Sequence, residues 1–375
     1  MRVRQNCNVV NQPVSQEMGW PWTATTSEAK RASANLANAC PASTSLVRLA
    51  SFQIQPPFAR NLQRIPTVKK LLQILQYSVR EMLLIGKTAT EQKVLAARAL
   101  ISQIRSMGPL ANFRDIEFKV FSQFGEDGIL QYLIMQTKVT PEERLFVEFG
   151  AEKYREANSR FLVVNDNWRG LLIDGSARNI AIIRNSPTFW TYDLTTVASF
   201  VTAENINSLI ENAGFSGPLG LLSIDIDGVD YWVWKALTVV DPVIVVAEYN
   251  SVFGGNRAVT VPYDPAFRRR NAHYSDLYFG CSLKALEILG AKKGYALVGS
   301  NSAGVNAFFV RRDRLNGLQP LSASEAYVES RVRESRNTKG NFSYVSGADR
   351  ARLIGHLPLT DIETGETVSV QEAVN

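Results

Sequence analysis

Residues 219–237, "LGLLSIDIDGVDYWVWKAL", place three aspartates at the end of a strongly apolar run. Leu and Ile dominate positions 219–226, which is typical of a strand that is buried on both faces of a parallel sheet. Because an unpaired carboxylate is costly inside such a strand, we expect Asp225, Asp227 and Asp230 at its carboxyl end. Open α/β sheets bind their ligands at that edge. The stretch is therefore a candidate site.

The surrounding sequence, from about residue 119 to 313, alternates short apolar runs with helical segments, as a βαβ series does. We predict parallel strands over 145–151, 170–176, 188–194, 219–227 and 242–250. A helix and a sixth strand follow within 282–301, and a seventh strand over 305–313 comes too soon after it for a helical crossover. That last pair should be antiparallel at the sheet edge. The expected fold is α/β: a doubly wound, mostly parallel sheet of seven strands with helices on both faces.

The rest of the chain is expected to form extensions, because 375 residues exceed the length of most single domains. We predict a disordered basic arm over 1–60, a helical extension over 61–118, the α/β domain over 119–315 and an irregular C-terminal segment over 316–375. Apolar residues recur at helical spacing between Leu71 and Leu83, and a second helical stretch lies around 94–104. Their apolar stripe is expected to pack on the α/β domain.

Composition and charge exclude some classes of protein. No apolar run approaches the roughly 20 residues of a membrane span, so no transmembrane segment is expected. Residues 1–100 hold 13 Lys and Arg against 4 Asp and Glu, while the remainder holds 28 against 31. The positive charge thus belongs to the arm, which we interpret as a solvated segment, and no nucleic-acid partner is expected. The three cysteines are too few for a disulfide framework and suit a cytoplasmic protein. The oligomeric state stays open.

Acidic residues end four consecutive predicted strands: Glu148, Asp174, Asp193 and Asp225. The first strand is followed by Gly150 and, about two dozen residues later, by Asp174. This spacing resembles nucleotide-binding sites, in which a glycine permits close backbone approach and a later carboxylate binds ribose hydroxyls. A helix cap or a turn could explain any one of these acids. The four together are better explained by a ligand-binding edge.

Five motifs carry a resemblance to a known family: "FSQFGEDGIL" (121–130), "FVEFGA" (146–151), "NSRFL" (158–162), "WRGLLIDGS" (168–176) and "LLSIDIDGVDYWVW" (221–234). Over roughly residues 119–313 the chain resembles class I S-adenosylmethionine-dependent methyltransferases of the FkbM-like group. The resemblance implies a Rossmann-like methyltransferase fold, methyltransferase activity and S-adenosylmethionine as cofactor.

The resemblance also implies six cofactor-binding residues: Ser122, Gln123, Glu148, Gly150, Asp174 and Asp193. By this likeness Glu148 and Gly150 would lie beside the methionine part, Asp174 at the ribose hydroxyls and Asp193 near the adenine. Ser122 and Gln123 would close over the cofactor. The sequence departs from the family pattern after "EFGA", where the bulky, charged residues 152–156 follow and could obstruct the methionine pocket.

The catalytic candidates are Asp225, Asp227 and Glu248, which would lie where the methyl group faces an acceptor hydroxyl. One carboxylate could act as the general base. Alternatively, the three could hold Mg²⁺ or another divalent cation, which lowers the pKa of the hydroxyl. A further alternative is that Asp225 binds the cofactor, while Asp227 and Asp230 cap the helix that starts at Tyr231.

A polar loop after the fifth strand, residues 263–276, supplies another candidate base, His273. Three arginines of this loop, Arg268, Arg269 and Arg270, could hold an anionic acceptor. A surface loop without a catalytic part is the competing interpretation.

The sequence thus favours an S-adenosylmethionine-dependent O-methyltransferase that acts on a hydroxyl of a sugar, a glycan precursor or a small metabolite. Two alternatives belong to other classes. The chain could be a non-catalytic binding protein on the same fold, because fold does not determine function. An NAD-binding oxidoreductase would also use acids at the sheet edge, but the first strand is not followed by G-x-G-x-x-G.

Overall fold

The computed structural model describes residues 66–108, 110 and 112–374, and the chain divides into two units, 1–82 and 83–375. Helix α4 (Pro66–Ile104) begins in the first unit and ends in the second. It is one continuous helix, whereas the sequence suggested two helical stretches. Between those two stretches, Thr90 Oγ1 donates a hydrogen bond to the Gly86 carbonyl at 3.0 Å. The expected packing of the stripe from Leu71 to Leu83 stays a prediction, and the arm over 1–60 lies outside the described residues.

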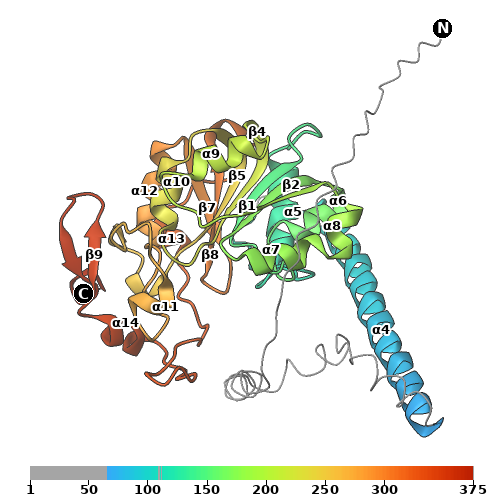
Figure 1. The fold of residues 1–375 in the computed structure, drawn as a ribbon. Helices are drawn as coiled ribbons and strands as arrows, with labels where there is room; N and C mark the ends of the chain where they lie inside the picture. The colour runs from blue at the N-terminus through green and yellow to red at the C-terminus, as the bar shows by residue number, and fades with distance from the viewer. Residues whose placement is uncertain (1–65, 109, 111, 375) are drawn as a thin grey trace, which may run out of the picture. The chain divides into compact units, whose positions relative to one another are not determined.

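The second unit is built on a seven-stranded sheet of order β3-β2-β1-β4-β5-β8-β7 (Figure 1). Its strands are β1 (Leu145–Phe149), β2 (Arg169–Asp174), β3 (Leu194–Ala198), β4 (Gly217–Ile224), β5 (Val240–Glu248), β7 (Tyr295–Ser300) and β8 (Asn306–Arg311). The first five are parallel, and β8 runs antiparallel to both β5 and β7. The predicted mostly parallel sheet with an antiparallel hairpin is therefore confirmed, and the fold is Rossmann-like.

Helices cover both faces of this sheet (Figure 1). One face packs on α5 (Glu126–Gln136), α6 (Arg160–Asp166), α7 (Ala177–Arg184) and α8 (Pro187–Thr191). The other packs on α9 (Ile206–Asn212), α10 (Asp230–Ala236), α12 (Leu283–Lys292) and α13 (Ala323–Ala326). Because side chains alternate along a strand, Phe146 enters the first core and Val147 and Phe149 enter the second. This alternation also decides where the acids of each strand point.

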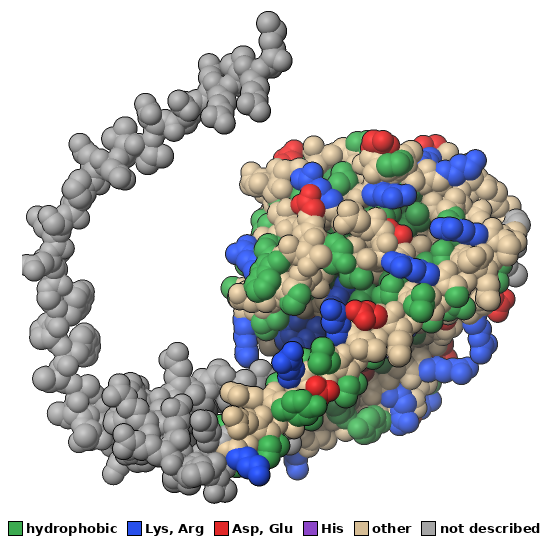
Figure 2. Space-filling model, turned by 90° about the vertical axis from the view of Figure 1, so that its right-hand side faces the viewer, with side chains coloured by type: hydrophobic (Ala, Val, Ile, Leu, Met, Phe, Trp, Pro, Cys, Tyr) green, Lys and Arg blue, Asp and Glu red, His purple; other side chains and the backbone are tan. Residues whose placement is uncertain are grey.

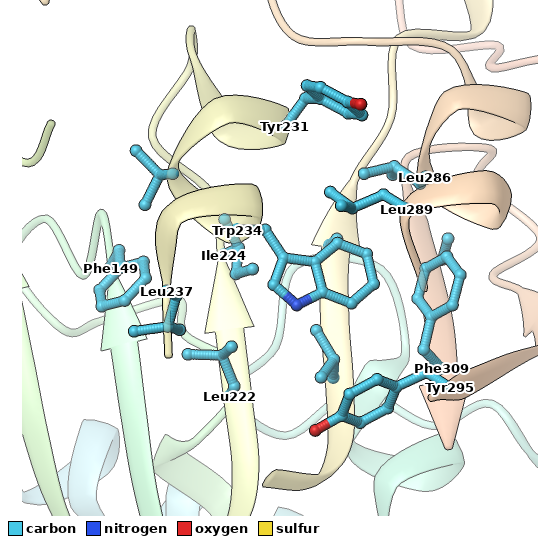
Figure 3. Packing of buried hydrophobic residues seen from close by; sticks show 14 of the residues in the cluster. Phe149, Leu222, Ile224, Tyr231, Trp234, Leu237, Leu286, Leu289, Tyr295 and Phe309 are labelled. Atoms are coloured by element: carbon cyan, nitrogen blue, oxygen red, sulfur yellow. The ribbon is translucent and has the colours of Figure 1, made fainter. Parts of the chain in front are cut away.

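Trp234 of α10 fills the centre of the second core (Figure 3). Its ring lies 5.0 Å from that of Phe309 and 6.1 Å from that of Tyr295, both in tilted or edge-on contact. A buried aromatic of this size typically stabilises a fold by about 3–5 kcal/mol relative to alanine. Trp234 is thus a packing residue, and it fixes α10 and the loop before it against β4 and β5.

One predicted strand is wrong. Residues 188–191 of the predicted strand 188–194 belong to helix α8 (Pro187–Thr191). Ser186 caps this helix by accepting a hydrogen bond from the Phe189 N–H, and Pro187 occupies its first turn, a favourable start for a helix. The strand β3 begins only at Leu194, so Asp193 precedes the strand instead of ending it.

The segment after residue 315, which we expected to be irregular, forms several short elements. After η3 (Arg312–Arg314) and α13 come α14 (Ala348–Ile354), β9 (Pro358–Asp361), β10 (Thr367–Ser369) and α15 (Val370–Val374). Strand β9 pairs with β10 and with β6 (Val259–Thr260), which lies in the long loop after β5 together with η2 (Ser251–Phe253) and α11 (Arg269–Ala272). The C-terminal segment is thereby attached to the loop that follows β5.

Two further features concern the surface and the entry to the domain. The 3₁₀ turn η1 (Arg114–Ile116) leads from α4 into α5. None of the helices in the described part of the chain has the length and apolar character that a membrane span requires. On the face in Figure 2, Lys and Arg side chains are spread among apolar and uncharged ones.

Candidate active site

A cavity of about 490 Å³ opens at the carboxyl edge of the sheet. It is lined by residues that follow β1, β2, β4 and β5, by the turn before β8, and by the segment 330–335. Its size falls within the roughly 300–1,000 Å³ of small-molecule sites. The topology explains its position, because parallel strands bring their carboxyl ends to one edge.

The backbones of Gly150 and Asp225 pack against each other in the wall of this cavity. Gly150 follows β1 with φ +72°, and a Cβ on it would lie 1.7 Å from the main-chain oxygen of Asp225. Only glycine permits this approach of two chain segments. The predicted cofactor glycine and the first predicted catalytic acid are therefore immediate neighbours in the wall of the cavity.

Asp174 ends β2 and lines the same cavity. Its carboxylate accepts hydrogen bonds from the N–H groups of Glu152 and Ser176, both at 2.8 Å, and from Asn179 Nδ2 at 3.1 Å. Two carboxylate oxygens offer about four acceptor positions, so capacity remains for a ligand hydroxyl. The side chain is thus oriented by its neighbours and can accept hydrogen bonds from a ribose.

The bulky segment 152–156 does not fill the cavity. Tyr154 turns inward, is buried, and lies 2.9 Å from Ser159 through its hydroxyl group. Glu152 and Glu156 line the cavity, and Glu156 forms an ion pair with Lys119 at 3.0 Å. The departure from the family pattern therefore adds two acids to the wall beside Gly150.

Three carboxylates meet in the middle of the cavity wall: Asp225, Asp227 and Glu248. One ligand atom from each lies within 4.8 Å of the others. Burial raises the pKa of Asp225 well above its usual range, and the charge of Asp227 raises it further. Burial and the charge of Asp225 do the same for Glu248, whose Oε2 is buried without a hydrogen-bond partner among the described residues. The sequence prediction that these acids lie together is met by the geometry.

Asp227 forms an ion pair with Arg269 of α11. The guanidinium of Arg269 stacks on Phe279 at 3.7 Å and donates from Nε to the carbonyl of Asp276 at 2.6 Å. Asp227 has φ +55°, which turns the chain after β4 toward the cavity, and its side chain is 56% exposed. Arg269 therefore lies beside the carboxylates and pairs with one of them, and its suggested role in holding an anionic acceptor stays a prediction.

Asp230 organises the loop between β4 and α10. Its two carboxylate oxygens accept hydrogen bonds from the N–H groups of Ile226 (2.9 Å) and Gly228 (3.0 Å). The residue is buried, is the first of α10 and does not line the cavity. Asp230 thus holds the loop before α10, whereas none of the described side chains caps the start of this helix, so the capping interpretation is not supported.

Two residues assigned to the cofactor by resemblance support loops instead of lining the cavity. Glu148 points to the α6 side of the sheet, where it accepts hydrogen bonds from the Asn158 N–H (2.9 Å) and from Ser159. Ser122 is buried and accepts a hydrogen bond from the Asp127 N–H at 3.1 Å. Its neighbour Gln123 does line the cavity.

Two other predicted site residues lie elsewhere. Asp193 is at the amino edge of the sheet, where it is 72% exposed and pairs with Arg169 at 3.5 Å. His273 does not line the cavity; its Nδ1 lies 2.7 Å from Ser275 Oγ, and its ring is 6.1 Å from that of His356. Burial and the neighbouring His356 lower the pKa of His273.

Some cavity residues carry no recognisable sequence signal. The segment 330–335 and Arg350 come from the C-terminal part of the chain and line the cavity beside residues 248–252. Ser330 is attached there by its N–H, which donates to Ser251 Oγ at 3.1 Å. No spacing rule connects residues so far apart in sequence.

No family profile and no curated protein sequence matches this chain. Among solved structures, it is similar to an O-methyltransferase from Bacillus cereus in complex with SAH, with 14% identity and a TM-score of 0.32 over 58% of this chain and 89% of the other. It is also similar to an S-adenosylmethionine-dependent methyltransferase from Clostridium acetobutylicum, with 10% identity, a TM-score of 0.27 and coverages of 38% and 58%. A third is M. capricolum TrmK in complex with S-adenosyl-homocysteine, with 10% identity, a TM-score of 0.29 and coverages of 48% and 65%.

These TM-scores are low, so the assignment of the fold rests on the chain's own strand order and register. The five parallel strands, the antiparallel β8 inserted between β5 and β7, and the helices on both faces form a Rossmann-like methyltransferase fold.

Proposed function

We propose that this protein is an S-adenosylmethionine-dependent O-methyltransferase that acts on a hydroxyl of a sugar, a glycan precursor or a comparable small metabolite. One observation carries the proposal: a single cavity joins Gly150 and Asp174 to the carboxylates of Asp225, Asp227 and Glu248. Such a site can bind a ribose-bearing cofactor next to groups that act on a hydroxyl.

The residues of the cavity fit the cofactor. Gly150 leaves room where a side chain would meet Asp225, and Asp174 retains acceptor capacity for ribose hydroxyls. Gln123, from the segment that we expect to close over the cofactor, lines the same cavity. The bound cofactor supplies an electrophilic methyl group on a sulfonium. The acidic wall around it suits a positively charged ligand.

The carboxylate cluster supplies the acid–base chemistry. A hydroxyl placed against Asp225, Asp227 and Glu248 could pass its proton to one of them, and a raised carboxylate pKa would make that carboxylate a stronger base. The same three groups are oxygen ligands of the kind that Mg²⁺ prefers. A cation bound there would lower the pKa of the hydroxyl.

Calorimetric titration of the full chain with S-adenosylmethionine and with S-adenosylhomocysteine tests the proposal. We expect saturable binding of both and transfer of a labelled methyl group to an acceptor in a panel of hydroxyl compounds. Absence of binding at millimolar cofactor, with the protein folded by circular dichroism, would refute the enzyme assignment. Binding without transfer to any hydroxyl would favour a non-catalytic protein on this fold.

A further inference from the structure

Arg350 of α14 is the only buried Lys or Arg among the side chains that the structure describes, with 5% of its surface exposed. Its Nη2 donates one hydrogen bond, to Glu329 Oε1 at 3.0 Å, and its Nε is buried with no partner among the described residues. A guanidinium carries five N–H donors, and a buried charge is costly unless it is well paired. Arg350 is therefore a buried cation with unused donors.

Arg350 lines the same cavity as Glu248. Along the sheet the order β2, β1, β4, β5, β8 places Asp174 at one end of the cavity and the turn before β8 at the other. The segment next to Arg350 is fixed at that second end, because the Tyr249 hydroxyl donates to the Val328 carbonyl at 2.7 Å. In Figure 1, α11 and α14 lie on the β8 side of the sheet. Arg350 is thus placed on the acceptor's side of the carboxylates.

Arg350 lies between a cavity whose charged residues are mainly acidic and a second hollow whose charged residues are mainly basic. The cavity is lined by seven acids and two arginines, and one of these, Arg269, already pairs with Asp227. Together with Ser330 and Val332, Arg350 also lines an open hollow of about 880 Å³ whose charged residues are four arginines and Glu329. A negatively charged ligand group is repelled along most of the cavity and attracted where these two spaces meet.

We propose that the acceptor carries an anionic group, a phosphate or a carboxylate, which binds Arg350 while the acceptor's hydroxyl lies against the carboxylate cluster. The inference rests on the proposed function and specifies its substrate class. The planar guanidinium suits either anion, because it donates two parallel hydrogen bonds to it. Attraction at Arg350 and repulsion at Asp225 and Glu248 would orient the acceptor with its hydroxyl toward the methyl donor.

A purely structural role is the competing explanation, in which Arg350 only pairs with Glu329. The Glu329 side chain is 59% exposed, so solvent screens this pair, and the pair leaves Nε unsatisfied. The two explanations differ in what they predict for anion binding, which can be measured without any acceptor.

The experiment titrates the full chain with inorganic phosphate and, separately, with malonate, at constant ionic strength, by calorimetry. We expect millimolar binding of at least one anion, weakened about tenfold or more in Arg350→Met, since charge-assisted hydrogen bonds are lost. Arg312→Gln is the control: Arg312 is exposed and follows β8, at the opposite edge of the sheet. Tighter phosphate binding would identify a phosphorylated acceptor, and tighter malonate binding a carboxylate.

Glu329→Gln keeps the test decisive if Arg350→Met does not fold. Removing the carboxylate that competes for Arg350 should strengthen anion binding, whereas a structural role predicts no change. Equal anion affinity in wild type, Arg350→Met and Glu329→Gln, or no anion binding by the wild type, would overturn the inference. Cofactor titrations of the same proteins are read separately, so failure of the methyltransferase proposal would appear as missing cofactor binding whatever the anion result.

Discussion

The backbone of Gly150 packs directly on the main-chain carbonyl of Asp225, with 1.7 Å between that oxygen and the position a Cβ would take. The contact joins the ends of β1 and β4, which carry the predicted cofactor site and the first of the clustered carboxylates. The proposed cofactor site and the proposed catalytic carboxylates are therefore joined by one backbone contact.

Gly150→Ala should separate β1 from β4 at this point. We expect a loss of stability clearly larger than the 1–2 kcal/mol cost of a positive φ for alanine, and a loss of S-adenosylmethionine affinity. Gly214→Ala is the matched control, because Gly214 also has a positive φ (+82°) but no atom within 4 Å of the added Cβ. Denaturant unfolding and calorimetry measure both effects. Equal stability of the two variants would mean that the contact is easily relieved.

The strands that the sequence predicts well are the central ones. The runs that form β1, β2, β4 and β5 are buried on both faces and therefore strongly apolar. The edge strand β3, "LTTVA" (194–198), is half-exposed and rich in Thr, so it carries no such signal. The aromatic run before it was more strand-like in composition, but Ser186 and Pro187 start a helix there. Asp193 was misplaced for this reason.

The site residues that could be predicted from the sequence are those at the carboxyl ends of strands. Asp174, Asp225 and Glu248 reach the cavity because the sheet topology brings them there. Glu148 could have been excluded by the two-residue period of a strand, since it shares a face with Phe146 and points toward α6. Arg350 could not be predicted, because its position depends on the packing of the short C-terminal elements against the loop after β5.

Asp174→Asn and Asp227→Asn should separate binding from chemistry. Asp174→Asn is expected to weaken cofactor binding by about 1–3 kcal/mol, the typical cost of losing a charge-assisted hydrogen bond. Asp227→Asn should remove most methyl transfer and leave cofactor affinity nearly unchanged. Asparagine tolerates the positive φ of Asp227, so the variant adds no backbone strain. Calorimetry measures the cofactor affinity of both variants, and single-turnover assays measure their methyl transfer. Full turnover by Asp227→Asn would exclude a catalytic role for Asp227 and leave it only its ion pair with Arg269.

Mg²⁺ or Mn²⁺ should bind the carboxylate cluster if the cation mechanism operates. We then expect chelation to abolish transfer, added Mg²⁺ or Mn²⁺ to restore it, and Glu248→Gln to weaken metal affinity by more than about tenfold, since a ligand is lost. Glu156→Gln is the control, because Glu156 lines the cavity outside the cluster. Transfer that persists in chelator would exclude the cation role and assign a carboxylate as general base.

Asp127 should make the stability of the fold depend on pH. One of its oxygens accepts hydrogen bonds from the N–H groups of Val120, Phe121 and Ser122, at 2.7, 2.7 and 3.0 Å, and thereby fixes the loop that leads to Gln123. Burial nevertheless raises its pKa from 3.8 to about 6. The folded state therefore binds the Asp127 proton more tightly than the unfolded state does. The stability gained from this proton binding is complete below about pH 4 and is lost as the pH rises through about 6.

The isosteric Asp127→Asn variant isolates this contribution, because its amide does not titrate. Between pH 4 and pH 6 the wild type should lose about 2 kcal/mol of unfolding free energy relative to the variant, and the difference should stay constant above about pH 7. Urea unfolding of both proteins across this range measures it. A difference that does not change between pH 4 and pH 6 would mean that Asp127 stays ionised in the fold, with its three backbone hydrogen bonds outweighing the cost of burial.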